Sequence, residues 1–207
     1  AIDNGTQKLI SVVLVGLGQY GTEMLRALSW FCQMDGYQVE INVFDKNPMA
    51  EEKFTMLCPE LMSPERNGTS ISGEAQYKIT IHSGVDVESI KFSHCLKALS
   101  QVSHVFIALG DDAQNTKAAI STRILCERNN QHPRIQAIVH NPLKKKALET
   151  ITDYRGHKYN IEFIGDLYSS YSEDVIIDSE LESIALKRHL KWGKESDFWA
   201  YEFNYRS

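Results

Sequence analysis

One stretch of sequence, VVLVGLGQYGTEML at residues 12–25, decides the fold. It begins as an apolar, β-branched run, breaks at three glycines and resumes with apolar residues at helical spacing. A strand followed by G-x-G-x-x-G and a helix is the context in which this glycine spacing indicates a dinucleotide-binding turn. The sequence therefore predicts a nucleotide-phosphate site between a first strand, residues 8–16, and a first helix, residues 20–34.

Each glycine of this turn has a physical task. Gly16 permits the tight turn, Gly18 lets the backbone approach a pyrophosphate, and Gly21 lets the helix lie close to the strand. The helix start then offers unpaired N–H groups and a partial positive charge to the phosphates. The alternative is a structural turn that binds no ligand. The remaining candidate contacts within the turn are Leu17, Gln19 and Tyr20.

Strand and helix patterns alternate along the rest of the chain. Further strands are expected at residues 37–47, 77–84, 103–110, 134–141 and 159–166. Helices are expected at residues 49–58, 88–99 and 112–130, and from Pro142 onward. This alternation predicts an α/β fold with a doubly wound parallel sheet of six strands, Rossmann-like in its architecture.

Two segments stand apart from this alternation. Residues 62–76 are polar and rich in Gly, Ser and Pro, which indicates a loop. After the last strand, residues 172–192 have the capping and charge order of a helix, and an aromatic-rich tail follows. We therefore expect a nucleotide-binding domain at residues 1–168 and a linker or docking segment at residues 169–207.

An acidic residue lies at the end of the second strand, at the expected distance from the glycines. Asp45 lies 24 residues after Gly21, close to the separation of about 20 that places a carboxylate on the adenosine ribose. Such a carboxylate repels a 2′-phosphate, which favours NAD over NADP, although Lys46 beside it weakens that inference. The alternative role for Asp45 is that of a turn residue before Asn47-Pro48.

Three later strand ends should meet the same edge of the sheet, because ligands in such sheets bind outside the carboxyl ends of the strands. Gly84-Val85-Asp86 follows the third strand, and Gly110-Asp111-Asp112 follows the fourth. His140 ends the fifth strand, near the expected nicotinamide. The alternative for Gly84 and Gly110 is that they are loop residues without ligand contact. The alternative for His140 is that it caps the helix that begins at Pro142.

The order of these motifs resembles the TrkA-N type of Rossmann domain, which includes the regulator-of-K⁺-conductance (RCK) domains. The resemblance spans roughly residues 9–150, and its most specific part is Gly110-Asp111-Asp112 followed by Asn115. It implies a nucleotide-sensing, often dimeric domain that binds NAD(H) or an adenine nucleotide such as ADP or ATP. It also implies that Val85 and Asp86 border the adenine and that Leu109 and Gly110 face the far half of the ligand.

Composition narrows the function classes. Of 207 residues, 43% are hydrophobic and 24% are charged, which is typical of a globular protein, and the net charge of -5 argues against nucleic acid as a partner. No apolar run is long enough to span a membrane. Four scattered cysteines and no metal-ligand spacing indicate free thiols, no metal site and a cytoplasmic location.

Two functions remain open. The first is a non-catalytic, regulatory nucleotide-binding domain excised from a larger protein, which forms a homodimer or docks on another domain through residues 172–207. The second is an NAD(P)-dependent oxidoreductase whose substrate part lies outside this chain. The candidate acid–base residues His82, His140 and Asp111 fall into no recognisable catalytic arrangement, which favours the first.

Overall fold

The computed structural model describes residues 2–3, 8–31, 37–62, 77–99, 101–153, 155–165 and 190. The chain divides into a unit of residues 1–164 and a second unit that begins at Gly165. Apart from Leu190, the predicted helix at residues 172–192 and the aromatic tail lie outside the described residues. So does nearly all of the predicted loop at residues 62–76. The predicted domain boundary at residue 168 stays a prediction.

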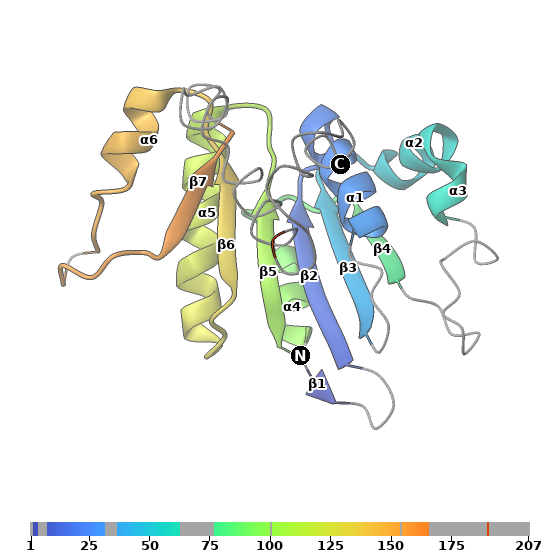
Figure 1. The fold of residues 1–207 in the computed structure, drawn as a ribbon, viewed down its shortest axis with the longest axis horizontal. Helices are drawn as coiled ribbons and strands as arrows, with labels where there is room; N and C mark the ends of the chain where they lie inside the picture. Colours follow the sequence, from blue (N-terminus) through green and yellow to red (C-terminus); the bar gives the residue numbers. More distant parts are fainter. Residues whose placement is uncertain are drawn as a thin grey trace. The chain divides into compact units, whose positions relative to one another are not determined.

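A single sheet carries the predicted α/β architecture (Figure 1). Its six parallel strands follow the order β4-β3-β2-β5-β6-β7, so that β2 and β5 are neighbours at the centre. The strands are β2 (Lys8–Val15), β3 (Tyr37–Asp45), β4 (Tyr77–Ser83), β5 (Val102–Ile107), β6 (Arg134–Ile138) and β7 (Ile161–Ile164). The chain thus winds outward from β2 to β4 and then returns to β5, which reverses the strand order beside β2.

A short additional strand was not predicted. β1 (Ile2–Asp3) pairs antiparallel with the start of β2, where Ile2 lies opposite Leu9 and Asp3 opposite Lys8. Two residues are too few to show a strand period in the sequence.

Helices cover both faces of the sheet, as a doubly wound fold requires. They are α1 (Gln19–Phe31), α2 (Ala50–Leu57), α3 (Pro59–Met62), α4 (Ile90–Ala98), α5 (Asp112–Arg128) and α6 (Pro142–Leu148). Leu25 of α1 and Phe54 of α2 share one core cluster with Leu14, whereas Phe92 of α4 shares another with Val13. Because successive residues of β2 are buried on opposite faces, this strand reads as a continuous apolar run.

Capping residues explain where several helices begin. Ser89 accepts the backbone N–H of Phe92 at the start of α4, and Asp111 caps α5 in the same manner. Asn141 caps α6, whose first residue is Pro142. The helix predicted at residues 49–58 ends at Leu57 and is followed directly by α3.

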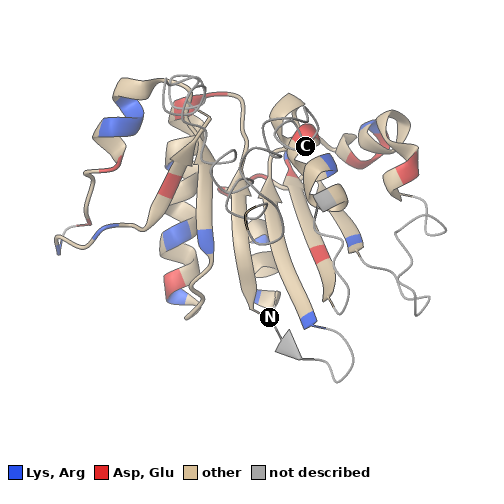
Figure 2. Cartoon of the chain, viewed as in Figure 1, with Lys and Arg blue, Asp and Glu red and all other residues tan. Residues whose placement is uncertain are grey.

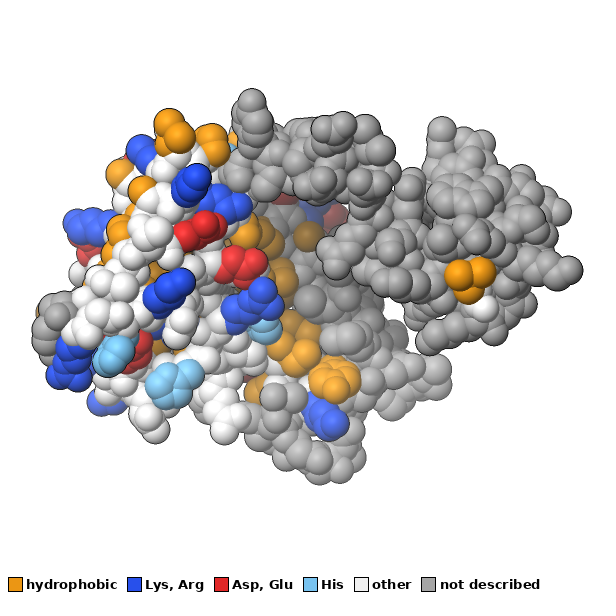
Figure 3. Space-filling view, turned by 60° about the vertical axis from the view of Figure 1, so that its left-hand side comes forward, with side chains coloured by type: hydrophobic (Ala, Val, Ile, Leu, Met, Phe, Trp, Pro, Cys, Tyr) orange, Lys and Arg blue, Asp and Glu red, His pale blue; other side chains and the backbone are white. Residues whose placement is uncertain are grey.

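Charged side chains are distributed over many elements. Lys and Arg are interspersed with Asp and Glu over the sheet and its helices (Figure 2). Three consecutive lysines, residues 144–146, lie on α6, where Lys144 and Lys146 are exposed, and the face that bears α6 mixes basic, acidic and apolar side chains (Figure 3). Among the described residues, no helix is long and apolar enough to cross a membrane.

Candidate functional site

The glycine-rich turn joins β2 to α1, and at two of its three glycines there is no room for a side chain. Gly16 has a φ of +95°, and a Cβ added there would lie 2.5 Å from the carbonyl oxygen of Ala108. A Cβ on Gly21 would overlap the carbonyl oxygen of Gly16. A Cβ on Gly18, by contrast, would meet no atom within 4 Å. The fold itself therefore requires the first and third glycines, whereas the second leaves open space beside the turn.

The start of α1 is suited to an anion. Its first intrahelical hydrogen bond runs from the N–H of Thr22 to the carbonyl of Gly18 at 2.9 Å, so the N–H groups before Thr22 precede the helical ladder. No acidic side chain occupies the first turn. The partial positive charge of the helix start is therefore not neutralised by its own sequence.

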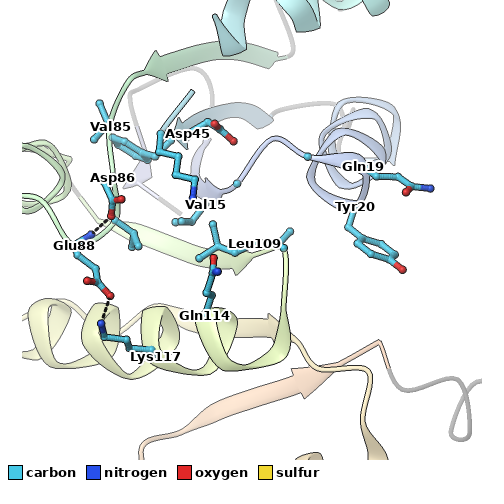
Figure 4. A pocket seen from close by; sticks show the side chains of 17 residues that line it. Val15, Gln19, Tyr20, Asp45, Val85, Asp86, Glu88, Leu109, Gln114 and Lys117 are labelled. Carbon is cyan, nitrogen blue, oxygen red and sulfur yellow. Dashed lines mark hydrogen bonds and ion pairs between the residues drawn. The ribbon is translucent and has the colours of Figure 1, made fainter. Parts of the chain in front are cut away.

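A cleft of about 680 Å³ lies beside this turn, at the point where the strand order reverses (Figure 4). Its walls come from the glycine-rich turn, the ends of β3, β4 and β5, and the first two turns of α5. The predicted site residues that line it are Gly16, Gly18, Gln19, Tyr20, Asp45, Lys46, Val85, Asp86, Leu109 and Gly110. Four further predicted residues lie outside this lining, namely Leu17, Gly21, Asp111 and His140.

Asp45 connects the end of β3 to the glycine-rich turn. Its Oδ2 accepts the backbone N–H of Leu17 at 2.6 Å, and its Oδ1 accepts that of Asn47 at 2.7 Å. Asp45 is half-buried and also lines the cleft. Each carboxylate oxygen can accept a second hydrogen bond, so Asp45 retains acceptor capacity toward the cleft. The alternative role in a turn and the predicted role toward a ligand are thus compatible in one side chain.

The far wall of the cleft contains residues that the sequence did not single out. Glu88, from the loop before α4, forms an ion pair of 2.6 Å with Lys117 of α5. Gln114 lies one turn before Lys117 and lines the same wall (Figure 4). The i, i+3 spacing of Gln114 and Lys117 after a strand end is the signal that could have identified them. The other unpredicted lining residues are Val15, Phe44, Val87 and Ala108.

Asp111 and Asp112, at the start of α5, make hydrogen bonds that stabilise the fold. Asp111 caps the helix by accepting the N–H groups of Ala113 and Gln114. Asp112 accepts the N–H of His140 at 2.9 Å and that of Asn141 at 3.1 Å. Although burial acts to raise it, these hydrogen bonds hold the pKa of the Asp112 carboxyl below its ordinary value. The start of α5 is therefore fastened to the end of β6.

Asn115 links the ends of β5 and β6. It is 1% exposed, and its Oδ1 accepts the N–H of Leu109 at 2.6 Å while its Nδ2 donates to the carbonyl of Ile138 at 2.9 Å. These contacts satisfy backbone groups at the two strand ends where the strand ladder has stopped.

The candidate acid–base residues His82 and His140 make contacts with different neighbours. His82 stacks on Phe44, with ring centroids 4.4 Å apart, and its Nε2 lies 3.1 Å from Oδ1 of Asn42. Burial lowers the pKa of His82, and nearby Lys91 lowers it further. The ring of His140 lies 4.9 Å from that of Tyr20. Among the described residues, no group of His, Cys, Asp and Glu is arranged to hold a metal ion.

Strand order, parallel pairing and a cleft at the reversal define an open, doubly wound α/β protein of the Rossmann-like class. The structure is similar to that of GenD2 from gentamicin A biosynthesis in complex with NAD, with a TM-score of 0.45 and 10% sequence identity. The match covers 91% of this chain and 42% of that chain, so the present chain spans less than half of its length. No family model matches the sequence, and no curated protein matches it.

Proposed function

We propose that this chain is a regulatory domain that binds an adenine nucleotide, with NAD(H) as the dinucleotide it prefers over NADP(H). The observation that carries the proposal is the joint position of the α1 start and Asp45 in one cleft. The helix start offers N–H groups to phosphates, and the carboxylate offers acceptors to ribose hydroxyls. The separation of the glycine-rich turn and Asp45 along the sequence is typical of a turn that binds a pyrophosphate and a carboxylate that binds the adjoining ribose.

The remaining cleft residues suit the base of such a ligand. Val85 is buried, and Leu109 from the β5 end is half-buried, so they offer apolar contact to a flat ring. Asp86 and Glu88 add carboxylate acceptors at the outer rim. An exocyclic amine donates to such acceptors, whereas a carbonyl oxygen is repelled by them. Both purines carry an exocyclic amine, so this chemistry suits a purine base.

A sensing role is supported by what the candidate acid–base groups already do. Asp111 is a helix cap, and His82 stacks on the buried Phe44. Gly110-Asp111-Asp112 and Asn115, the most specific part of the TrkA-N resemblance, tie the start of α5 to the ends of β5 and β6. A ligand held by α5 and these strand ends would bias their position, which is the requirement for transmitting a bound state.

Titration calorimetry with ADP, NAD, NADP and GDP tests this function on the 207-residue chain. We expect saturable binding of ADP and NAD and weaker binding of NADP, and GDP measures how far the site distinguishes the two purines. Absence of heat and of any thermal stabilisation with millimolar ADP and NAD would exclude an adenine-nucleotide site, because a ligand that binds only the native state must raise its stability.

A further inference from the structure

An aromatic contact joins Tyr20, which lines the cleft, to His140, which lies outside the lining. Tyr20 and His140 have ring centroids 4.9 Å apart and an interplanar angle of 42°. The two rings come from distant elements, since Tyr20 is the second residue of α1 and His140 follows β6. Tilted ring pairs at this separation attract one another beyond simple area burial.

The contact lies where the cleft stops. Tyr20 lines the cleft, but the lining reaches no residue of β6 or α6 within the described part of the chain. On that side it ends at Gly110 and Gln114. The cleft therefore spans the ends of β3, β4, β2 and β5, and the ring pair connects its lining residue Tyr20 with His140 after β6.

The backbone that carries one ring is held in place, and the other ring belongs to an exposed side chain. The backbone N–H of His140 is held by Asp112 at 2.9 Å, and the neighbouring carbonyl of Ile138 is held by Asn115. Tyr20 is 51% exposed on the first turn of α1. Its ring can turn to another χ1 rotamer without a change of backbone, so separation of the pair needs only a side-chain rotation.

A dinucleotide needs the space that this pair occupies. In a doubly wound sheet the two nucleotide halves lie on opposite sides of the strand-order reversal, with the pyrophosphate at the helix start between them. If adenosine lies against Asp45 and Val85, the second ribose and its base continue past Gly110 toward the end of β6. Tyr20 and His140 meet on that path.

We propose that the Tyr20–His140 contact selects the ligand by size, an inference that rests on the proposed adenine-nucleotide site. ADP and related mononucleotides bind with the two rings in contact. A dinucleotide binds only when the Tyr20 ring has turned away from His140. The two residues are therefore specificity determinants that lower the affinity for NAD relative to ADP, and neither is needed for the adenosine and pyrophosphate contacts.

The ratio of the dissociation constants for NAD and ADP measures this effect. We expect His140→Ala and Tyr20→Ala each to lower the ratio by about 2- to 10-fold, the worth of one aromatic pair. The double variant should gain little more than either single variant, because both changes remove the same contact. His132→Ala is the matched control, since this exposed histidine precedes β6 at its opposite end.

A spectroscopic readout separates this mechanism from a simple change in affinity. The ring resonances of His140 carry a ring-current shift from Tyr20, which NAD should abolish and ADP should preserve. An unchanged or higher ratio in His140→Ala, with ADP still bound, overturns the size selection and leaves the nucleotide site intact. Failure of both ligands to bind the unmodified chain instead removes the nucleotide site, and the size selection with it.

Discussion

Asp45 and Leu17 are joined by a hydrogen bond of 2.6 Å from the backbone N–H of Leu17 to the Asp45 carboxylate. The bond connects the end of β3 with the middle of the glycine-rich turn, 28 residues earlier. The side chain proposed to hold a ribose therefore also shapes the turn proposed to hold the phosphates. A change at Asp45 acts on both parts of the site.

Replacement of Asp45 by Asn should narrow the preference for NAD over NADP. The amide keeps one oxygen acceptor for the turn but loses the charge that repels a 2′-phosphate. We expect the ratio of the two dissociation constants to change by about 5- to 30-fold, corresponding to about 1–2 kcal/mol. Asp45→Ala should narrow the preference as well, with an added loss of affinity for both ligands.

Asp153→Asn provides the control, because Asp153 also accepts two backbone N–H groups in a turn, those of Arg155 and His157, but does not line the cleft. Calorimetry on the three variants supplies the comparison. Equal affinities for NAD and NADP in the unmodified chain would contradict the role assigned to Asp45.

The second and third glycines of the turn should separate binding from folding. Gly18→Val places a side chain in open space beside the turn, so we expect a native midpoint of urea unfolding and loss of nucleotide binding. Gly21→Ala forces a methyl group against the carbonyl oxygen of Gly16 and should cost about 1–3 kcal/mol of unfolding free energy. A Gly18→Val protein that binds ADP normally would show that phosphates do not approach this turn.

Asn115→Ala should destabilise the fold strongly. The change leaves the N–H of Leu109 and the carbonyl of Ile138 without their side-chain partner in a buried position. Each unpaired group costs about 1–3 kcal/mol, so we expect a loss of at least about 2 kcal/mol in urea unfolding. Thr116→Ala, which removes only a hydroxyl bond to the carbonyl of Asp112, should change stability by less than about 1 kcal/mol. Similar losses in both variants would argue against the bridging role of Asn115.

Asp112 should contribute a defined part of the acid sensitivity of the fold. Its pKa is lowered in the native state below the value of 3.8, so its stabilising contribution is present above that value and disappears as the pH falls through the native pKa. Asp112→Asn should therefore lower the unfolding free energy at pH 6 and make less difference near pH 2. A stability deficit that does not shrink on acidification would disagree with ionised Asp112 holding His140 and Asn141.

The parts of the fold that follow from local pattern could be read from the sequence. The six strands and their parallel direction were predicted from apolar runs that alternate with helical patterns. The placement of Gly16 and Asp45 at the edge of the sheet was predicted from their positions at the ends of strands. Several predicted strands extend two or three residues too far. Val139, for example, is buried beyond the end of β6, so the apolar pattern outlasts the strand ladder.

Side-chain contacts between elements that are distant in the sequence could not be predicted in the same way. The Glu88–Lys117 ion pair and the Tyr20–His140 ring contact join side chains that local spacing does not relate. Their geometry depends on how α5 and the β6 end are set against the sheet, which is decided by packing over the whole domain. The sequence therefore indicated where a ligand could approach, and the structure added how far along the sheet the cleft extends.

The Asn115 bridge also has a kinetic consequence. Because its amide pairs with Leu109 and Ile138, the β5 end that lines the cleft is held in place in the folded chain and need not be ordered by an arriving ligand. Binding then forgoes the entropy of ordering a loop, and its rate is set by diffusion and orientation, on the order of 10⁵–10⁷ M⁻¹s⁻¹. In the proposed function, the residence time of the ligand, rather than any slow rearrangement of the sheet, would therefore set how quickly the domain returns to its unbound state.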